Sequence, residues 1–262
     1  KASLVPIMNS LVSRLSLADI ILVSIMVGST ATAALVQASR TFTLIVRYSE
    51  IFLRVLYPKL IRDNKNEDIT LTFRLQSFVV IPLAVGAFIM AEPLLGILGE
   101  QYVVAVNIMR ILVILAVVEG IEYFMWNILA GTDKVDEKIE ELNLKKLKHS
   151  WLVKLPIMDL TKSMTYFSIL ITIMYLFGDI VDDITLGEYW AIAALSTTTV
   201  LTAYKCVLAR KTINFEIPSS SIIKYIFAGI IMGGFLYFYQ SYIQWTDTSV
   251  IGTLTYVTIP GT

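Results

Sequence analysis

Residues 81–120, IPLAVGAFIMAEPLLGILGEQYVVAVNIMRILVILAVVEG, decide the fold class. Two long apolar runs flank the polar sequence GEQY, and they continue beyond the quoted stretch over about 75–96 and 103–130. About 20 apolar residues suffice for an α-helix to cross the hydrocarbon core of a bilayer. Both runs lack the alternating pattern of barrel strands, which leaves helices as the spanning structure. We therefore predict two transmembrane helices joined by a short loop.

The rest of the chain has the same character. Its 262 residues are 56% hydrophobic and 16% charged, with a mean hydropathy of +0.72, a composition far from that of soluble domains. Further apolar runs predict helices over 4–27, 31–57, 151–177, 188–208 and 220–240, with a truncated eighth from about 249. The predicted fold class is an all-α polytopic membrane protein. Because the sequence begins without Met and ends within a span, we expect a longer protein.

Basic residues alternate between the loops. Lysines and arginines gather after helices 31–57, 103–130 and 188–208, whereas the other four loops contain none. Cytoplasmic loops of membrane proteins carry an excess of these residues. We therefore predict a multi-pass protein of the cell membrane, with its amino-terminal end and the three basic loops in the cytoplasm.

Several function classes are disfavoured. With 21 basic and 21 acidic residues the formal net charge is zero, so no basic field favours nucleic acid. One cysteine and one histidine, Cys206 and His149, provide neither a disulfide framework nor a zinc cluster. The sequence DIVDD resembles a magnesium-binding prenyltransferase cluster, but it lies in a predicted outer loop without a second cluster. We predict no enzyme activity, catalytic residue, metal, cofactor or nucleic-acid partner.

Helix 31–57 carries charges inside its apolar sequence. An arginine near a bilayer centre costs roughly 2.5–3.5 kcal/mol on insertion scales, so such residues face protein or a water-filled cavity. Glu50 can pair with the arginines at i−3 and i+4, which leaves the stripe with net positive charge. The arginine fork suits phosphate or carboxylate. At about 100° per residue, the stripe fits an arc about 80° wide and comprises Arg40, Thr43, Arg47, Glu50 and Arg54.

Two other helices carry acidic residues in apolar sequence. Asp19 lies in helix 4–27, and Glu119 and Glu122 lie in helix 103–130. Together with Glu50, these carboxylates could counter the arginines, or they could bind and release protons or cations during transport. The sequence leaves both interpretations open.

A structural interpretation of the charges also stays open, in which they form interhelical ion pairs or reach the membrane surface. Lys154, Lys205 and Lys224 each lie close to a predicted cytoplasmic boundary, so we expect their side chains to snorkel. We expect Asp159 to pair with Lys162 in the same helix.

Residues 81–120 resemble the C-terminal region of the polysaccharide exporters and lipid-linked oligosaccharide flippases, whose superfamily also contains the MATE drug antiporters. In that region a Pro/Gly helix runs into EPLL, a short glycine loop with an acid and an aromatic residue, and a helix similar to ILRIL. The segments LADIILVSIMVGSTATAALVQASR and NILAGTDKV fit the same pattern. The similarity covers about residues 1–200.

The resemblance implies a protein of two six-helix lobes. Residues 1–208 would be the second lobe, residues 209–262 would be additional C-terminal helices with the last one truncated, and an N-terminal lobe would be missing. The implied partners are the bilayer and a glycan on polyprenyl phosphate or diphosphate, moved to the outer leaflet by alternating access. The residues that would bind the phosphate and sugars of this lipid-linked glycan are Arg14, Arg40, Arg47 and Arg54.

Two alternatives belong to other classes. A MATE-like cation-coupled antiporter of drugs or small molecules would use Asp19, Glu119 and Glu122 as its main binding groups. A non-transporting membrane scaffold would hold the same charges in closed salt bridges, and a paired charge reversal at Arg47 and Glu50 would then preserve its function.

Overall fold

A computed structural model of the chain describes residues 18–27, 30–54, 66–131, 150–213 and 218–242. These residues are almost entirely helical and contain no strand, so the all-α prediction is confirmed for them. Five of the described helices are long and apolar enough to cross a membrane. The elements are α2 (Ala18–Val27), α3 (Ala31–Arg47), η1 (Tyr48–Phe52), α5 (Asn66–Ile89), α6 (Ala91–Leu98), η2 (Glu100–Ala105), α7 (Val106–Gly131), α9 (Trp151–Phe177), α10 (Asp183–Thr212) and α11 (Ser219–Tyr242).

The predicted helix bounds agree best with the helices of the structure where an apolar run has clear polar ends. Helix 151–177 coincides with α9, and helices 103–130, 188–208 and 220–240 correspond to α7, α10 and α11 with small shifts. The predicted eighth helix and residues 1–17 lie outside the described residues. The amino-terminal part of helix 4–27 therefore stays a prediction.

The predicted helix 75–96 is wrong at both ends. Helix α5 begins nine residues earlier, where Glu67 and Asp68 occupy the first turn and favour a helix start. It ends at Ile89 and is followed by the separate helix α6. In one continuous helix the ring of Pro93 would clash with the carbonyl of Ile89, four residues earlier. The proline instead lies in the first turn of α6, where it is tolerated.

The start of α10 is fixed by a side-chain cap. The carboxylate of Asp182 accepts hydrogen bonds from the hydroxyl and backbone N–H of Thr185, at 2.7 and 3.3 Å. These hydrogen bonds hold the pKa of the Asp182 carboxyl below its usual value. Within DIVDD, Asp182 therefore caps α10, and the carboxylate of Asp183 accepts a hydrogen bond from Thr32 of α3 at 2.5 Å, which joins the two helices.

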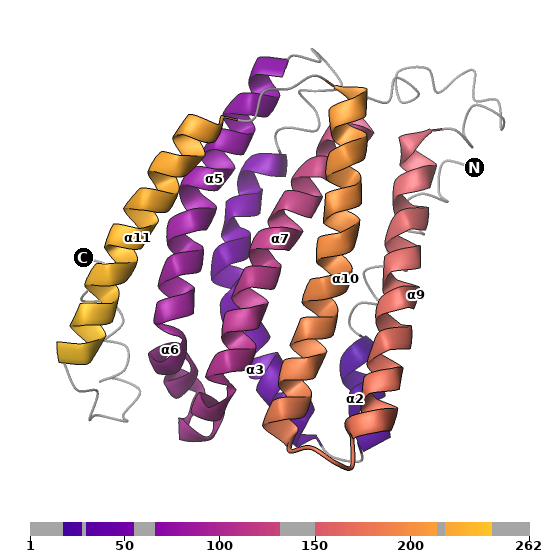
Figure 1. Ribbon diagram of the computed structural model, residues 1–262, viewed down its shortest axis with the longest axis vertical. Helices are drawn as coiled ribbons and strands as arrows, with labels where there is room; N and C mark the ends of the chain where they lie inside the picture. The colour runs from indigo at the N-terminus through magenta and orange to yellow at the C-terminus, as the bar shows by residue number, and fades with distance from the viewer. Residues whose placement is uncertain (1–17, 28–29, 55–65, 132–149, 214–217, 243–262) are drawn as a thin grey trace.

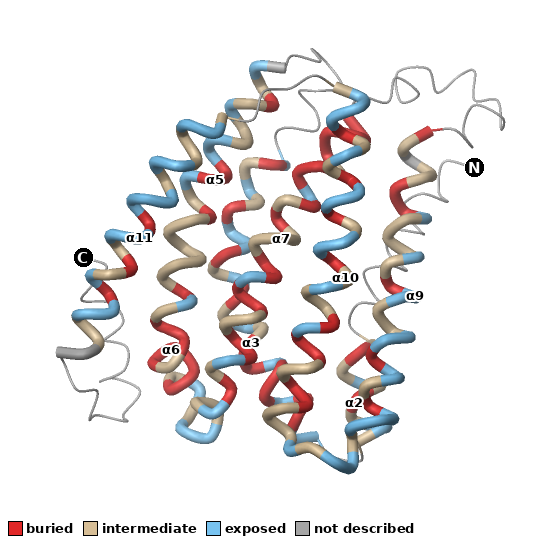
Figure 2. Tube along the Cα trace, in the orientation of Figure 1, coloured by how far each residue is buried: buried red, intermediate tan, exposed pale blue. Residues whose placement is uncertain are grey.

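Helix α7 lies in the middle of the bundle, packed against α3, α5 and α10 (Figure 1). Helix α9 lies beyond α10 at one edge and α11 lies beyond α5 at the other. Figure 2 shows buried residues concentrated along α7 and exposed residues along α11. The exposed side chains of α11 are mostly large and apolar, including Phe227 and Phe238. This surface is suited to contact with lipid.

The helix ends next to the three basic loops gather at one end of the bundle. In Figure 1 the amino-terminal ends of α5, α9 and α11 and the carboxyl-terminal ends of α7 and α10 lie at the top, opposite α6. This is the alternation that the distribution of lysine and arginine predicted. That this end faces the cytoplasm stays a prediction.

Two glycines on α11 allow its close approach to α5. A Cβ atom at Gly233 would lie 2.9 Å from side-chain atoms of Val85 and Ile89, and one at Gly229 would lie 3.1 Å from Ile81. The spacing of these glycines is GxxxG, which permits close helix packing in membranes. The close contact of α11 with α5 therefore depends on glycine, which has no side chain, at these two positions.

We expect Gly233→Val to destabilise the packing of α11 by about 1–3 kcal/mol, because added methyl groups overpack a tight contact. Thermal unfolding in detergent micelles measures the effect. Gly234→Val is the matched control, since a Cβ there meets nothing within 4 Å. Equal loss of stability in both variants would show that the helix contact is not the cause.

Candidate functional site

The predicted polar stripe divides in the middle of its helix. Helix α3 ends at Arg47 and continues as the 3-10 segment η1. A 3-10 helix turns about 120° per residue rather than about 100°, so five residues add about 100° of rotation. The single arc that a continuous α-helix predicted therefore does not extend to Arg54, which follows η1. Arg54 is exposed, whereas Glu50 is half-buried.

Four helices meet at the carboxylate of Asp19, whose side chain is only 2% exposed. Arg40 of α3 donates to it at 2.5 and 3.2 Å, and the hydroxyl of Tyr166 on α9 donates at 2.7 Å. The indole N–H of Trp190 on α10 lies 2.6 Å from the Tyr166 oxygen and 3.3 Å from Asp19, and the guanidinium lies 5.2 Å from the ring centroid. We call Asp19, Arg40, Tyr166 and Trp190 the Asp19 network.

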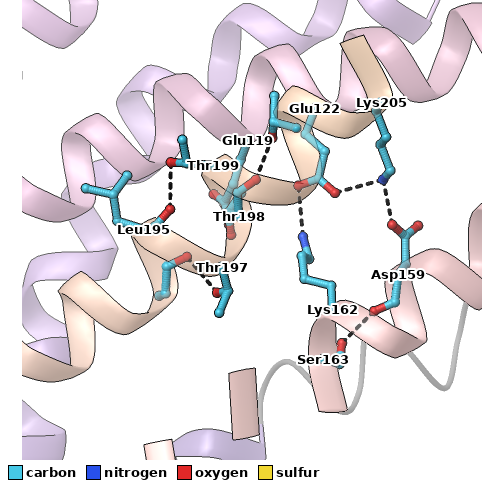
Figure 3. Close-up of polar contacts among 12 residues, drawn as sticks. Glu119, Glu122, Asp159, Lys162, Ser163, Leu195, Thr197, Thr198, Thr199 and Lys205 are labelled. Carbon is cyan, nitrogen blue, oxygen red and sulfur yellow. Dashed lines mark hydrogen bonds and ion pairs between the residues drawn. The ribbon is translucent and has the colours of Figure 1, made fainter. Parts of the chain in front are cut away.

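A second network joins α7, α9 and α10 (Figure 3). Lys205 of α10 is 1% exposed, and its Nζ atom lies 2.8 Å from Glu122 of α7 and 2.6 Å from Asp159 of α9. The Nζ atom of Lys162 on α9 lies 2.8 Å from the other oxygen of Glu122. We call Glu122, Asp159, Lys162 and Lys205 the Glu122 network.

The Glu122 network corrects two predictions. Lys205 does not snorkel, because carboxylates from two other helices replace the water that its ammonium group would otherwise need. Asp159 pairs with Lys205 and Lys162 pairs with Glu122, so the two residues are not partners of each other. Of the other two lysines, Lys224 is exposed, while the ammonium group of Lys154 lies 5.1 Å from the Trp151 ring.

One ion pair lies between the two networks. Arg47 of α3 and Glu119 of α7 are 2.5 Å apart, with side chains that are 43% and 26% exposed. Glu119 lies one turn before Glu122 on α7. Among the five ion pairs found in the described residues, this one has the most exposed side chains. It is therefore the pair that an incoming ligand could reach most easily.

The charged groups line two neighbouring cavities. The larger, here called the polar cavity, has a volume of about 550 Å³ and is lined by Asp19, Arg40, Arg47, Glu119 and Lys162, with residues of α2, α3, α7, α9 and α10. The smaller, of about 220 Å³, is lined by Glu50, Glu122 and Lys205 among others. Arg47, Glu119 and Lys162 line both. The polar cavity thus has three cations against two carboxylates on its wall.

The structure brings together most of the predicted site residues. Two of the arginines face the polar cavity beside two of the predicted acids, and the other two acids line the smaller cavity. Arg54 lines neither cavity. Arg14 lies outside the described residues. No group of three or more His, Cys, Asp or Glu in the described ranges is placed to hold a metal.

Sequence reasoning missed the contributions of α9 and α10. Asp159, Lys162 and Tyr166 follow the spacing i, i+3, i+7 within an apolar run, which places them on one helix face. That polar face was a usable signal for α9. Trp190 gave no such signal, because a tryptophan in an apolar helix is ordinary core or interface sequence.

Comparisons of the chain with protein-family models, with curated proteins and with solved structures found no match. The fold indicates the coarser class of a multi-pass membrane protein, because the described residues contain five long apolar helices. In this chain, charged residues of different helices are paired around a polar cavity. Its resemblance to the flippases stays a prediction.

Proposed function

We propose that this chain is part of a membrane transporter that moves a glycan linked to polyprenyl phosphate or diphosphate from the cytoplasmic to the outer leaflet. The observation that carries the proposal is the polar cavity of about 550 Å³, which has more cations than carboxylates on its wall and is lined in part by three helices that are apolar enough to cross a membrane, α7, α9 and α10. A lipid tail can stay in the bilayer during such transport. The phosphate and sugars need a polar path, because charge and hydroxyl groups are costly to place in hydrocarbon.

The side chains of the cavity fit both parts of such a head group. Arg40, Arg47 and Lys162 offer charge-assisted hydrogen bonds to phosphate oxygens. Gln37 supplies an amide that can bind sugar hydroxyl groups, and Phe167 supplies an apolar ring. The cavity volume falls within the range of about 300–1,000 Å³ that is usual for small-molecule sites.

The pairing of the carboxylates weighs against a cation-coupled antiporter. Asp19, Glu119 and Glu122 each lie within 2.8 Å of an arginine or lysine. A cation substrate would have to compete with these fixed charges for the carboxylates. A scaffold with closed salt bridges would account for the pairs, but it would have no use for a polar cavity between them.

The test is leaflet translocation of a fluorescent lipid-linked oligosaccharide by the full-length protein in vesicles. The proposal expects the labelled head group to reach the outer leaflet in vesicles with protein and to stay inside in protein-free vesicles. A protein that moves no lipid-linked donor, but exports a cationic dye when a proton or sodium gradient is applied, would be the antiporter.

A further inference from the structure

A third hollow lies between α9 and α10. It has a volume of about 550 Å³ and a mostly apolar lining that includes Ile157, Ile169, Val200 and Tyr204. These four side chains are 36–72% exposed. We call it the apolar groove. An exposed apolar groove on two helices that are long and apolar enough to cross a membrane is suited to contact with lipid chains.

The hydroxyl groups in the lining do not make the groove polar. Thr161 donates to the backbone carbonyl of Ile157, Thr165 to that of Thr161, and Thr197 to that of Ala193, at 2.8–2.9 Å. Each hydroxyl proton is therefore used within its own helix. The groove offers a long apolar ligand a surface without free donors at these positions.

The apolar groove meets the polar cavity at two residues. Lys162 and Thr197 line both. Lys162 also lines the smaller cavity, so it is common to all three hollows. An apolar channel that joins a polar one at a cation is complementary to a lipid with a long chain and an anionic group at its end.

Lys162 is free to serve such a ligand. Its ammonium group has three donors, and Glu122 is its one ion-pair partner among the described residues. Glu122 would not be left uncompensated if Lys162 turned toward a phosphate, because Lys205 holds the other oxygen of the same carboxylate at 2.8 Å. Glu122 would then keep Lys205 as its ion-pair partner, and Lys205 would be shared between Glu122 and Asp159.

We propose that the apolar groove between α9 and α10 binds the polyprenyl chain of the phosphorylated lipid, with its phosphate on Lys162 at the entrance to the polar cavity. The inference rests on the proposed function for the identity of the lipid. The groove gives the chain a fixed place in the membrane while the glycan occupies the cavity. Lys162 then acts as a positioning and binding residue for the phosphate.

Equilibrium binding of radiolabelled polyprenyl phosphate to the full-length protein in detergent tests this inference, with the unphosphorylated polyprenol and phosphatidic acid as competitors. Val200→Trp fills the groove at a 72% exposed position, and Ile230→Trp places the same ring at a 64% exposed position on α11. We expect Val200→Trp to weaken binding at least tenfold, Ile230→Trp to leave it unchanged, and neither competitor to displace the ligand at equal concentration.

Unchanged binding in a folded Val200→Trp protein would overturn the groove assignment. Equal competition by polyprenol would overturn the phosphate contact, and equal competition by phosphatidic acid would show a general anionic-lipid site instead. Lys162→Gln gives an independent readout, because it should weaken binding of polyprenyl phosphate and leave binding of polyprenol unchanged. Translocation that persists in Val200→Trp would overturn the groove alone, whereas binding without any translocation would overturn the transport function alone.

Discussion

Replacing Lys205 with methionine is expected to lower the free energy of unfolding by about 3–5 kcal/mol, the usual effect of breaking a buried ion pair. Lys205 is 1% exposed and contacts two carboxylates from other helices. Methionine keeps an unbranched apolar chain of similar length, so the expected loss of stability comes from removing the ammonium charge. Asp159 would then have no ion-pair partner among the described residues, while Glu122 would keep Lys162. Denaturant titration in mixed micelles measures the change.

Two further variants separate the charge effect from general damage to α10. Lys211→Met removes an exposed lysine from the same helix and is expected to change stability by less than about 0.5 kcal/mol. Adding Asp159→Asn to Lys205→Met removes the uncompensated carboxylate and should recover part of the lost stability. If Lys205→Met and Lys211→Met were equally stable, the paired and buried position of Lys205 would be refuted.

The error over Lys205 shows what the sequence lacks. Its position near the end of an apolar run predicted a place near the end of a helix, and Lys205 lies in the carboxyl-terminal part of α10. Whether it reaches out to the surface or inward depends on Glu122 and Asp159, which lie 83 and 46 residues away in the sequence. Hydropathy and loop charge act on one helix at a time, so they predicted the class and the order of helices. They carry no information about which faces meet.

The polar stripe illustrates the same limit within one helix. Sequence spacing selected Arg40 and Arg47, which both line the polar cavity, because a charge in an apolar run must avoid lipid. It failed for Arg54, since η1 changes the rotation per residue and nothing in the sequence YSEIF marks this change. The partners Asp19 and Glu119 were recognised as candidates, but their pairing with particular arginines follows from the packing of α2 and α7 against α3.

Arg47→Ala is expected to reduce translocation of lipid-linked oligosaccharide by about 10–100-fold. A hydrogen bond to a charged group contributes about 1.5–3 kcal/mol, which corresponds to this range. The substitution also leaves Glu119 without its ion-pair partner on the cavity wall, and that carboxylate would repel phosphate. Stability should change little, because an ion pair with side chains 43% and 26% exposed contributes about 1 kcal/mol or less. Initial translocation rates in vesicles with equal amounts of folded protein measure the effect.

Arg54→Ala is the matched control, since Arg54 comes from the same helical segment, is exposed and lines neither cavity. Translocation should be unchanged in this variant. The double variant Arg47→Glu with Glu119→Arg exchanges the two charges. It keeps an ion pair but moves the cation from α3 to α7. A structural bridge predicts full activity for the reversed protein, whereas a phosphate site predicts a loss close to that of Arg47→Ala, because the cation no longer lies beside Arg40 on the face of α3. Full activity of the reversed protein would therefore assign Arg47 to the scaffold and leave Arg40 and Lys162 as the remaining phosphate ligands.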